Sequence, residues 1–422
     1  MLNLNIIVPQ DRTRAKVIFT GHHHALWEET NCPFKHTHMD VQNEALYIFP
    51  TQKCRCEGDY GRIIGAQNFF HVSELKCPAP PGRGEVVKMD VRIAKNMSPL
   101  DQMQNLLAAK MEGVNSLIAT RMASENAPRI PEVTAHLVGA GGKRLRPMLT
   151  LASAHLFGYD GEDDQKLAAT VEFIHTATLL HDDVVDESAQ RRGRPTANLL
   201  WDNKSSVLVG DYLFSRSFQL MVECGSLQIL DILANASAVI AEGEVLQLSA
   251  AQDLNTDEAI YTKVIRGKTA ALFSAATEVG GIVAGATEAQ VKALQTYGDA
   301  LGMSFQIVDD LLDYGGATTD LGKNIGDDFR ERKMSLPVIL AVAKADEAER
   351  AFWSKVIEKG HQQEGDLEHA LELIAKHGIL DETRQKALDW ASQAKTALSP
   401  LPESEMKEVM ADLADFVVSR VT

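Results

Sequence analysis

Two short runs of aspartates are the residues in this sequence best suited to chemistry. One run lies in HDDVVD (181–186) and the other in DDLLD (309–313), with the same spacing. In a helix, residues four apart lie on one face, so the first and last aspartates of each run point the same way. The side chains concerned are Asp182, Asp183 and Asp186 in the first run, and Asp309, Asp310 and Asp313 in the second. Carboxylates this close repel one another, which predicts a shared positive partner.

Magnesium is the partner that these runs favour. Clustered carboxylate oxygens without a pattern of His or Cys ligands suit Mg²⁺, which keeps several waters and commonly holds substrate phosphates. A solvated acidic helix face is the alternative. The apolar stretches TATLL and FQIV precede the two runs, which indicates that the helical turn before each run is buried. This burial and the repetition of the run both favour a magnesium-diphosphate site over a solvated face.

Basic loops alternate with the aspartate runs. GGKRLRP (141–147) precedes the first run, RRGRP (191–195) follows it, and GKNIGDDFRERK (322–333) follows the second. Two glycines in the first loop let the backbone come close to a ligand, and Lys and Arg side chains are good phosphate donors. A single basic loop is usually only surface, but this order predicts that the loops serve the same ligand as the aspartates.

The motifs in this order resemble those of trans-type polyprenyl diphosphate synthases, the head-to-tail family that includes farnesyl and longer-chain enzymes. The resemblance covers roughly residues 97–422 and rests on GGKRLRP, EFIHTATLLHDDVVDESAQRRGRP, GKTAALF, FQIVDDLLDY and GKNIGDDFRERKMSLP. A terpene cyclase would share only the first aspartate motif. The resemblance implies an all-α fold, a single large helical bundle of the isoprenoid synthase type around a central cavity.

The resemblance also assigns roles to individual residues. It implies that isopentenyl diphosphate is held by Lys143, Arg146, His175 and Arg192. It implies that the allylic diphosphate, such as geranyl or farnesyl diphosphate, contacts Arg191, Lys268, Thr269, Gln306, Lys323 and Lys333. Asp182, Asp186 and Asp309 match the principal magnesium ligands, supported by Asp183, Asp310 and Asp313. Up to three Mg²⁺ ions, bridged by substrate, are implied.

These roles predict a magnesium-dependent prenyltransferase. Neutralised diphosphate leaves as an anion, an allylic carbocation remains, and the double bond of isopentenyl diphosphate adds to it. Loss of a proton, to the departing diphosphate, regenerates an allylic diphosphate that is one unit longer. No covalent intermediate with the enzyme is needed.

Small residues before the first aspartate run predict a long product. In the family a tunnel descends from this motif, and large side chains one turn earlier close it. Here the positions are Ala177 and Thr178, with Ile174 below them, although Phe173 lies close by. We expect octaprenyl to decaprenyl products, which serve as ubiquinone side chains. A medium-chain enzyme that makes geranylgeranyl diphosphate, and a non-catalytic subunit of a heteromeric synthase, are the alternatives.

Helical periodicity supports this fold from about residue 98 onward. Apolar stripes run through 163–187, 205–224, 227–249, 257–284, 287–313, 335–347 and 365–397. The chain has 422 residues and a formal net charge of -16, which argues against nucleic-acid binding. No apolar run reaches the roughly 18 to 20 residues of a membrane span. We expect a soluble, cytoplasmic protein that touches membrane at most transiently on product release, and the resemblance implies a homodimer.

Residues 1–88 differ in character from residues 89–422, for which we predict the synthase domain. The first stretch holds four of the five cysteines and shows no readable fold, so we predict an irregular or disordered extension. A zinc site is one hypothesis, but Cys54 and Cys56 are separated by one residue, which does not suit paired-Cys sites. A mis-assigned start, with translation beginning at Met89 or Met97, is the other.

Overall fold

The computed structural model describes residues 97–124, 126–139, 142–191, 193–315 and 325–420, together with the backbone of eight short strands between residues 3 and 95. The chain divides into two compact units, Met1–Ser98 and Pro99–Thr422. The aspartate runs and the basic loops all belong to the second unit.

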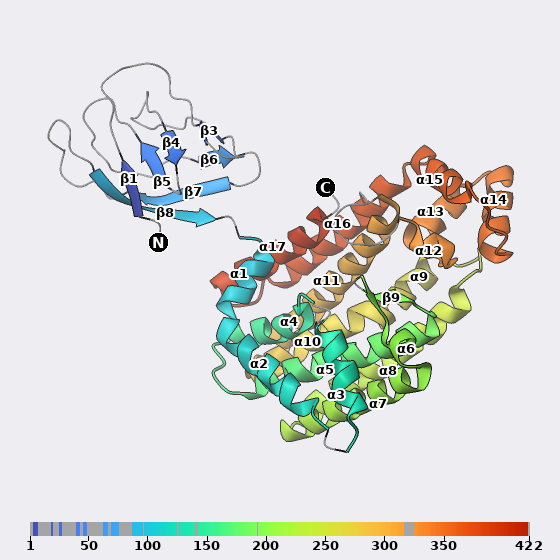
Figure 1. The fold of residues 1–422 in the computed structure, drawn as a ribbon, viewed down its shortest axis with the longest axis horizontal. Coiled ribbons are helices and arrows are strands. Elements are labelled where there is room, and N and C mark those ends of the chain that lie inside the picture. Colours follow the sequence, from blue (N-terminus) through green and yellow to red (C-terminus); the bar gives the residue numbers. More distant parts are fainter. Residues whose placement is uncertain are drawn as a thin grey trace. The chain divides into compact units, whose positions relative to one another are not determined.

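The first unit contains paired strands in the stretch where no fold could be predicted from the sequence. They are β1 (Asn3–Ile6), β2 (Ile18–Phe19), β3 (Ala25–Trp27), β4 (Met39–Gln42), β5 (Ala45–Ile48), β6 (Arg62–Gly65), β7 (Phe69–Leu75) and β8 (Val87–Lys95). One sheet has the order β1-β8-β7-β6-β3 (Figure 1). Another sheet has the order β2-β4-β5. β8 continues past residue 88, our predicted end of the extension. The cysteines of the zinc hypothesis lie outside the described residues, and the irregular extension and the mis-assigned start stay predictions.

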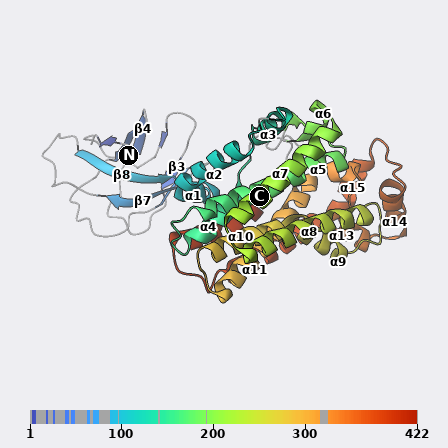
Figure 2. The ribbon, with the colours of Figure 1, turned by 90° about the horizontal axis from the view of Figure 1, so that it is seen from below.

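The second unit is helical throughout its described part, apart from one two-stranded ribbon, so the all-α prediction is confirmed (Figures 1 and 2). Its elements are α1 (Pro99–Leu106), α2 (Ala108–Arg121), α3 (Arg129–Gly139), α4 (Leu145–His155), α5 (Asp163–Val185), β9 (Gln190–Arg191), β10 (Arg194–Pro195), α6 (Ala197–Leu200), α7 (Asn203–Glu223), α8 (Leu227–Ala250), α9 (Glu258–Ile265), the π-helix η1 (Arg266–Ala270), α10 (Ala271–Val283), α11 (Glu288–Gly315), α12 (Asp327–Arg330), α13 (Leu336–Lys344), α14 (Glu347–Trp353), the π-helix η2 (Ser354–Glu358), α15 (Asp366–Lys376), α16 (Ile379–Ala397) and α17 (Glu405–Ser419).

Helix boundaries follow local sequence signals closely. Asp202 caps α7 by accepting from the Ser205 amide at 2.6 Å, and Asp257 caps α9 by accepting from the Ile260 amide at 2.9 Å. The predicted run 365–397 is divided into α15 and α16 at Gly378, whose φ of 64° favours glycine. The predicted run 257–284 is continuous but changes to π-helical geometry in η1, which the apolar periodicity did not reveal.

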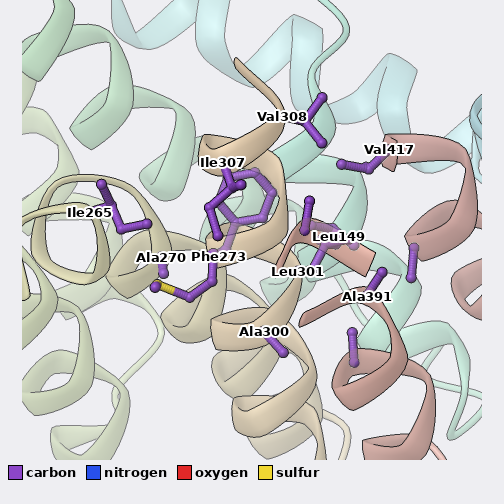
Figure 3. Packing of buried hydrophobic residues seen from close by; sticks show 14 of the residues in the cluster. Leu149, Ile265, Ala270, Phe273, Ala300, Leu301, Ile307, Val308, Ala391 and Val417 are labelled. Atoms are coloured by element: carbon purple, nitrogen blue, oxygen red, sulfur yellow. The ribbon is translucent and has the colours of Figure 1, made fainter. Parts of the chain in front are cut away.

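The core of the second unit surrounds α11. This helix lies beside α10 and α16, while α5 lies beside α7 (Figures 1 and 2). Figure 3 shows Phe273 of α10, Leu301 of α11 and Ala391 of α16 among the packed side chains, each at most 1% exposed. Burying a side chain such as Leu301 contributes about 1.5–3 kcal/mol. The segments that carry the two aspartate runs are therefore anchored in a packed interior.

Glycines let α11 approach the segment of η1 and α10 closely. A Cβ at Gly302 would lie 2.6 Å from the Ala270 Cα, and one at Gly298 would lie 2.5 Å from the Phe273 carbonyl oxygen. A side chain at either position would push the two helices apart. This close packing fixes α11, and with it the second aspartate run, against η1.

Candidate active site

The first aspartate run occupies the last turn of α5. Asp186 is the residue after the helix, but its amide still donates to the Asp182 carbonyl at 2.8 Å, so the expected one-turn spacing holds. Asp182 and Asp186 are half-buried. Asp183 is fully buried and lies between them in sequence. The three carboxylates therefore do not share one environment.

Asp183 is held by an arginine from the two-stranded ribbon. The guanidinium of Arg191 on β9 donates to the Asp183 Oδ1, from Nε at 2.8 Å and from Nη2 at 2.7 Å. The sequence assigned Arg191 to the allylic diphosphate, whereas here it neutralises a buried carboxylate. Arg192, the next predicted ligand, lies outside the described residues.

The second aspartate run lies near the end of α11, and neutral donors hold two of its members. Asp310 is 6% exposed and accepts from the Tyr261 hydroxyl at 2.8 Å. It also accepts from the Gln306 amide at 2.9 Å and the Leu336 backbone N–H at 3.3 Å. Asp313 accepts backbone N–H groups from Asp327 at 3.2 Å and Asp328 at 3.1 Å, at the start of α12.

A C-terminal arginine and the first basic loop meet the remaining aspartate of this run. The Arg420 Nη2 lies 3.5 Å from the Asp309 Oδ1. Burial lowers the pKa of Lys143, and so does the charge of Arg420, while Asp101 and Asp309 raise it. Lys143 thus lies within the electrostatic reach of Asp309.

Burial raises the pKa of three of these carboxyls to about 7. For Asp182, burial is the main cause, Lys268 opposes it, and Glu244 and Asp186 add to it. For Asp310 and for Asp313, burial is again first and the charge of Asp328 is second. Acids packed together in a poorly hydrated site favour protonation, and a bound cation would remove that preference.

Lysine 268 is placed by an unusual stretch of helix. It lies in η1, where the backbone of Gly267 passes so close to α8 that a Cβ on Gly267 would be 2.9 Å from the Gly243 Cα. The Lys268 Nζ lies 2.8 Å from the Glu244 Oε2 and 2.8 Å from the Gln247 Oε1. Short π-helical turns are frequent at functional sites.

Lysine 333 connects the two aspartate runs. Its Nζ lies 3.7 Å from the Asp186 Oδ2 of the first run. Its backbone N–H donates at 2.9 Å to the carbonyl of Asp328, whose own N–H caps Asp313 of the second run. Burial opposes the charge of Lys333, but Asp186, Glu331 and Asp328 outweigh burial and raise its pKa. The segment around α12 therefore brings residues of both runs to one place.

The other predicted ligands lie in two small networks. The Arg146 Nη1 donates to the His175 Nε2 at 3.3 Å, and its guanidinium carbon lies 4.5 Å from the centre of the Phe273 ring. The Thr269 hydroxyl donates to the Gln306 Oε1 at 2.8 Å. Lys323 lies outside the described residues.

Of the three residues expected to set product length, all on α5, Ala177 and Ile174 are buried and Thr178 is half-buried. Ala177 and Ile174 are 0% exposed, and the Thr178 hydroxyl donates to the His175 carbonyl at 2.8 Å. Ile174 packs in a cluster with side chains of α7, α8 and α10. The tunnel itself stays a prediction.

Magnesium fits the chemistry of these donors when a diphosphate completes its shell. Among the described residues, no group of three or more His, Cys, Asp or Glu side chains is arranged to hold a metal ion alone. The acids gathered near Lys268 and Lys333 offer carboxylate oxygens, the ligands that Mg²⁺ prefers, and Mg²⁺ commonly takes further ligands from water and substrate phosphate.

Sequence reasoning missed several neighbours of these residues. They are Glu244, Gln247, Tyr261, Asp328 and Arg420. Glu244 and Gln247 lie three apart on one face of α8, but that spacing does not indicate that the lysine of another element meets them. Nothing local in the sequence indicates that Tyr261 or Arg420 reaches the second run.

Comparisons with known proteins define the class of protein. The profile of the family described as polyprenyl synthetase matches residues 127–374. The chain is 44% identical over 326 residues to an octaprenyl diphosphate synthase of Haemophilus influenzae, covering 77% of this chain and 98% of the relative. The chain therefore belongs to the polyprenyl synthetase family, as the sequence predicted, and it is a prenyltransferase.

Two solved structures agree with this assignment. A decaprenyl diphosphate synthase from Rhodobacter capsulatus is 70% identical with a TM-score of 0.75, over 77% of this chain and 100% of that one. A polyprenyl synthase from Caulobacter crescentus, complexed with calcium and isoprenyl diphosphate, is 53% identical with a TM-score of 0.74, over 76% and 98%. None of the helices in the described part of the chain is long and apolar enough to cross a membrane.

Proposed function

We propose that this enzyme condenses isopentenyl diphosphate head-to-tail, in trans, onto geranyl or farnesyl diphosphate and makes an octaprenyl to decaprenyl diphosphate for ubiquinone. The observation that carries the proposal is the contact of Lys333 with Asp186, beside the α12 segment that caps Asp313. The names of the octaprenyl and decaprenyl relatives support the product length.

The cationic residues bind the diphosphate of the allylic substrate. Lys268 and Lys333 contact carboxylates or an amide oxygen now and can donate to diphosphate oxygens instead. Arg191 can offer its remaining N–H groups to the diphosphate while Nε and Nη2 stay on Asp183. Asp182, Asp186 and Asp309 would hold Mg²⁺, which supplies charge neutralisation to the leaving diphosphate. The Caulobacter relative, solved with a divalent cation and isoprenyl diphosphate, supports this arrangement.

The reaction then needs orientation rather than a protein nucleophile. The allylic C–O bond breaks with its electron pair passing to the diphosphate, and Thr269 and Gln306 offer dipoles near that end. Lys143, Arg146, His175 and Arg192 hold isopentenyl diphosphate so that its double bond forms the new C–C bond. The proton lost from the adduct passes to the departed diphosphate.

Product analysis tests the proposal. Purified single chain, Mg²⁺, isopentenyl diphosphate and farnesyl diphosphate should give products of eight to ten isoprene units on thin-layer chromatography. A geranylgeranyl endpoint would support the medium-chain alternative, and no turnover by the single chain would support the non-catalytic subunit.

A substitution before the first aspartate run tests the origin of that length. Ala177→Phe should shorten the product, because a ring would fill space next to the proposed tunnel, and Ala177→Ser should leave the length unchanged. Overpacking a fully buried site costs about 1–3 kcal/mol, so melting temperatures are measured beside product length. Unchanged product length in a folded Ala177→Phe enzyme would contradict the tunnel.

We also propose that the enzyme is a homodimer, because a row of large apolar side chains is exposed on α7 and α8. The most exposed of them are Leu208 (65%), Val222 (66%), Leu227 (82%), Val245 (64%) and Leu248 (61%). A second copy of the chain would cover this surface. Leu208→Lys with Leu248→Lys should give monomers in light scattering, whereas Leu388→Lys on α16, which is 40% exposed, should not.

We assign the catalytic activity to residues 89–422. The described site residues all belong to the unit Pro99–Thr422. A chain that begins at Met89 should keep the activity and product length of the full chain, and loss of activity after this truncation would overturn the assignment.

A further inference from the structure

Tyrosine 261 has no role in the function described so far, yet its hydroxyl meets the second aspartate run. The side chain is 4% exposed, on α9, and its hydroxyl donates to the Asp310 Oδ2 at 2.8 Å. Gln306 donates to the other oxygen, Oδ1, at 2.9 Å. Besides Tyr261, the Oδ2 has only the longer contact to the Leu336 N–H, at 3.3 Å, among the hydrogen bonds of the described residues.

These bonds extend into a chain that crosses three elements. Tyr261 of α9 joins Asp310 of α11, Asp310 joins Gln306 one turn earlier, and Gln306 accepts from Thr269 of η1 at 2.8 Å. Because α9 runs directly into η1, both ends of the chain belong to one continuous helical segment. That segment also carries Lys268, so the network fixes the lysine and the second aspartate run relative to each other.

We propose that Tyr261 is a positioning residue that holds Asp310, and through it Asp309 and Asp313, in the register needed to bind the diphosphate and its metal ions. The inference rests on the proposed function. Without the hydroxyl, a buried carboxylate oxygen would keep only its long backbone contact, and Asp310 would turn to find another donor. A displacement of about 1 Å at such a site can reduce turnover about a hundredfold.

The choice of substitution follows from the surroundings of the ring. The Tyr261 ring lines a cavity of about 220 Å³ together with Met303, Ile307 and Trp390. Truncation to Ala would enlarge this cavity and disturb packing. Tyr261→Phe keeps the ring and removes only the hydroxyl.

Tyrosine 297 offers a matched control. It is also fully buried, and its hydroxyl donates to the Met410 carbonyl at 2.8 Å. Tyr297→Phe therefore also removes one buried tyrosine hydrogen bond, here to a backbone carbonyl rather than a carboxylate, from a residue outside the network of Asp310. Both variants are studied in the full chain, at a temperature well below the lower of their melting temperatures.

The experiment compares kcat, the KM for each substrate, and the Mg²⁺ concentration that gives half-maximal rate. We expect Tyr261→Phe to lower kcat by about tenfold or more and to raise the Mg²⁺ requirement severalfold, with Tyr297→Phe close to wild type in both. Equal kcat and Mg²⁺ dependence in the two variants would overturn the positioning role. An inactive wild-type chain would instead contradict the proposed function.

Discussion

The two aspartate runs are nearly identical in sequence but are stabilised in different ways. In the first, the buried Asp183 is neutralised by the guanidinium of Arg191, and Asp186 faces Lys333. In the second, the buried Asp310 has a phenol, an amide and a backbone N–H, and Asp313 has two backbone N–H groups.

The difference shows how one spacing can serve two purposes within one site. Next to the first run, Lys333 can turn from Asp186 to a diphosphate and leave that partly exposed carboxylate available to a metal ion. In the second run neutral donors hold Asp310 and Asp313, while Asp309 faces a cation, Arg420. The middle aspartate of each run, Asp183 or Asp310, is the buried one.

Removal of the outward aspartates should have the largest effect. Asp182→Asn and Asp309→Asn should each lower kcat about a thousandfold, because each removes a proposed metal ligand that stabilises the leaving diphosphate. Steady-state assays at saturating Mg²⁺ measure the loss. Asp415→Asn, which breaks the exposed pair with Lys395, is the control. Full activity in one of the two site variants would show that the runs are not equivalent partners in catalysis.

Removal of the cation from the first run should reduce stability next most strongly. Arg191→Met leaves the carboxylate of Asp183, which is 0% exposed, without its charge partner and should lower the free energy of unfolding by about 3 kcal/mol. Lys333→Met should lower it by less than about 1 kcal/mol, because its partner Asp186 is 27% exposed. Urea denaturation compares the two. Similar losses of unfolding free energy in the two variants would contradict the idea that burial makes the Arg191–Asp183 pair the more stabilising one.

The pH dependence of stability should show the smallest effect. The pKa of Asp313 rises from 3.8 to about 7 on folding, so the folded protein binds more protons than the unfolded chain between these values. The free energy of unfolding should therefore fall as pH rises through that window. Asp313→Asn should weaken this fall, which melting curves from pH 5 to pH 8 in the absence of divalent ions would measure. A steeper fall in the variant would contradict the raised pKa.

Much of this site follows from local sequence. The spacing of Asp182 and Asp186, or of Asp309 and Asp313, fixes their shared face as soon as a helix forms, and their oxygens define the metals that they can bind. Apolar periodicity predicted α5, α7, α8 and α11 to within a few residues, whereas no predicted stripe corresponds to α3, α4, α14 or α17. The motifs in order gave the family, which the comparisons confirmed.

What the tertiary structure decided is the partner of each charged group. The sequence placed Asp183 and Asp310 in the same role, and it assigned Arg191 to substrate alone. Asp183 meets Arg191 because the β9–β10 ribbon packs beside it, and Asp310 meets Tyr261 because α9 brings that side chain to α11. Tyr261 comes from a segment distant in sequence. Lys268 meets Glu244 and Gln247 because two glycine backbones touch at the crossing of α8 and η1. Such contacts depend on how helices pack in three dimensions, and no spacing along one helix encodes them.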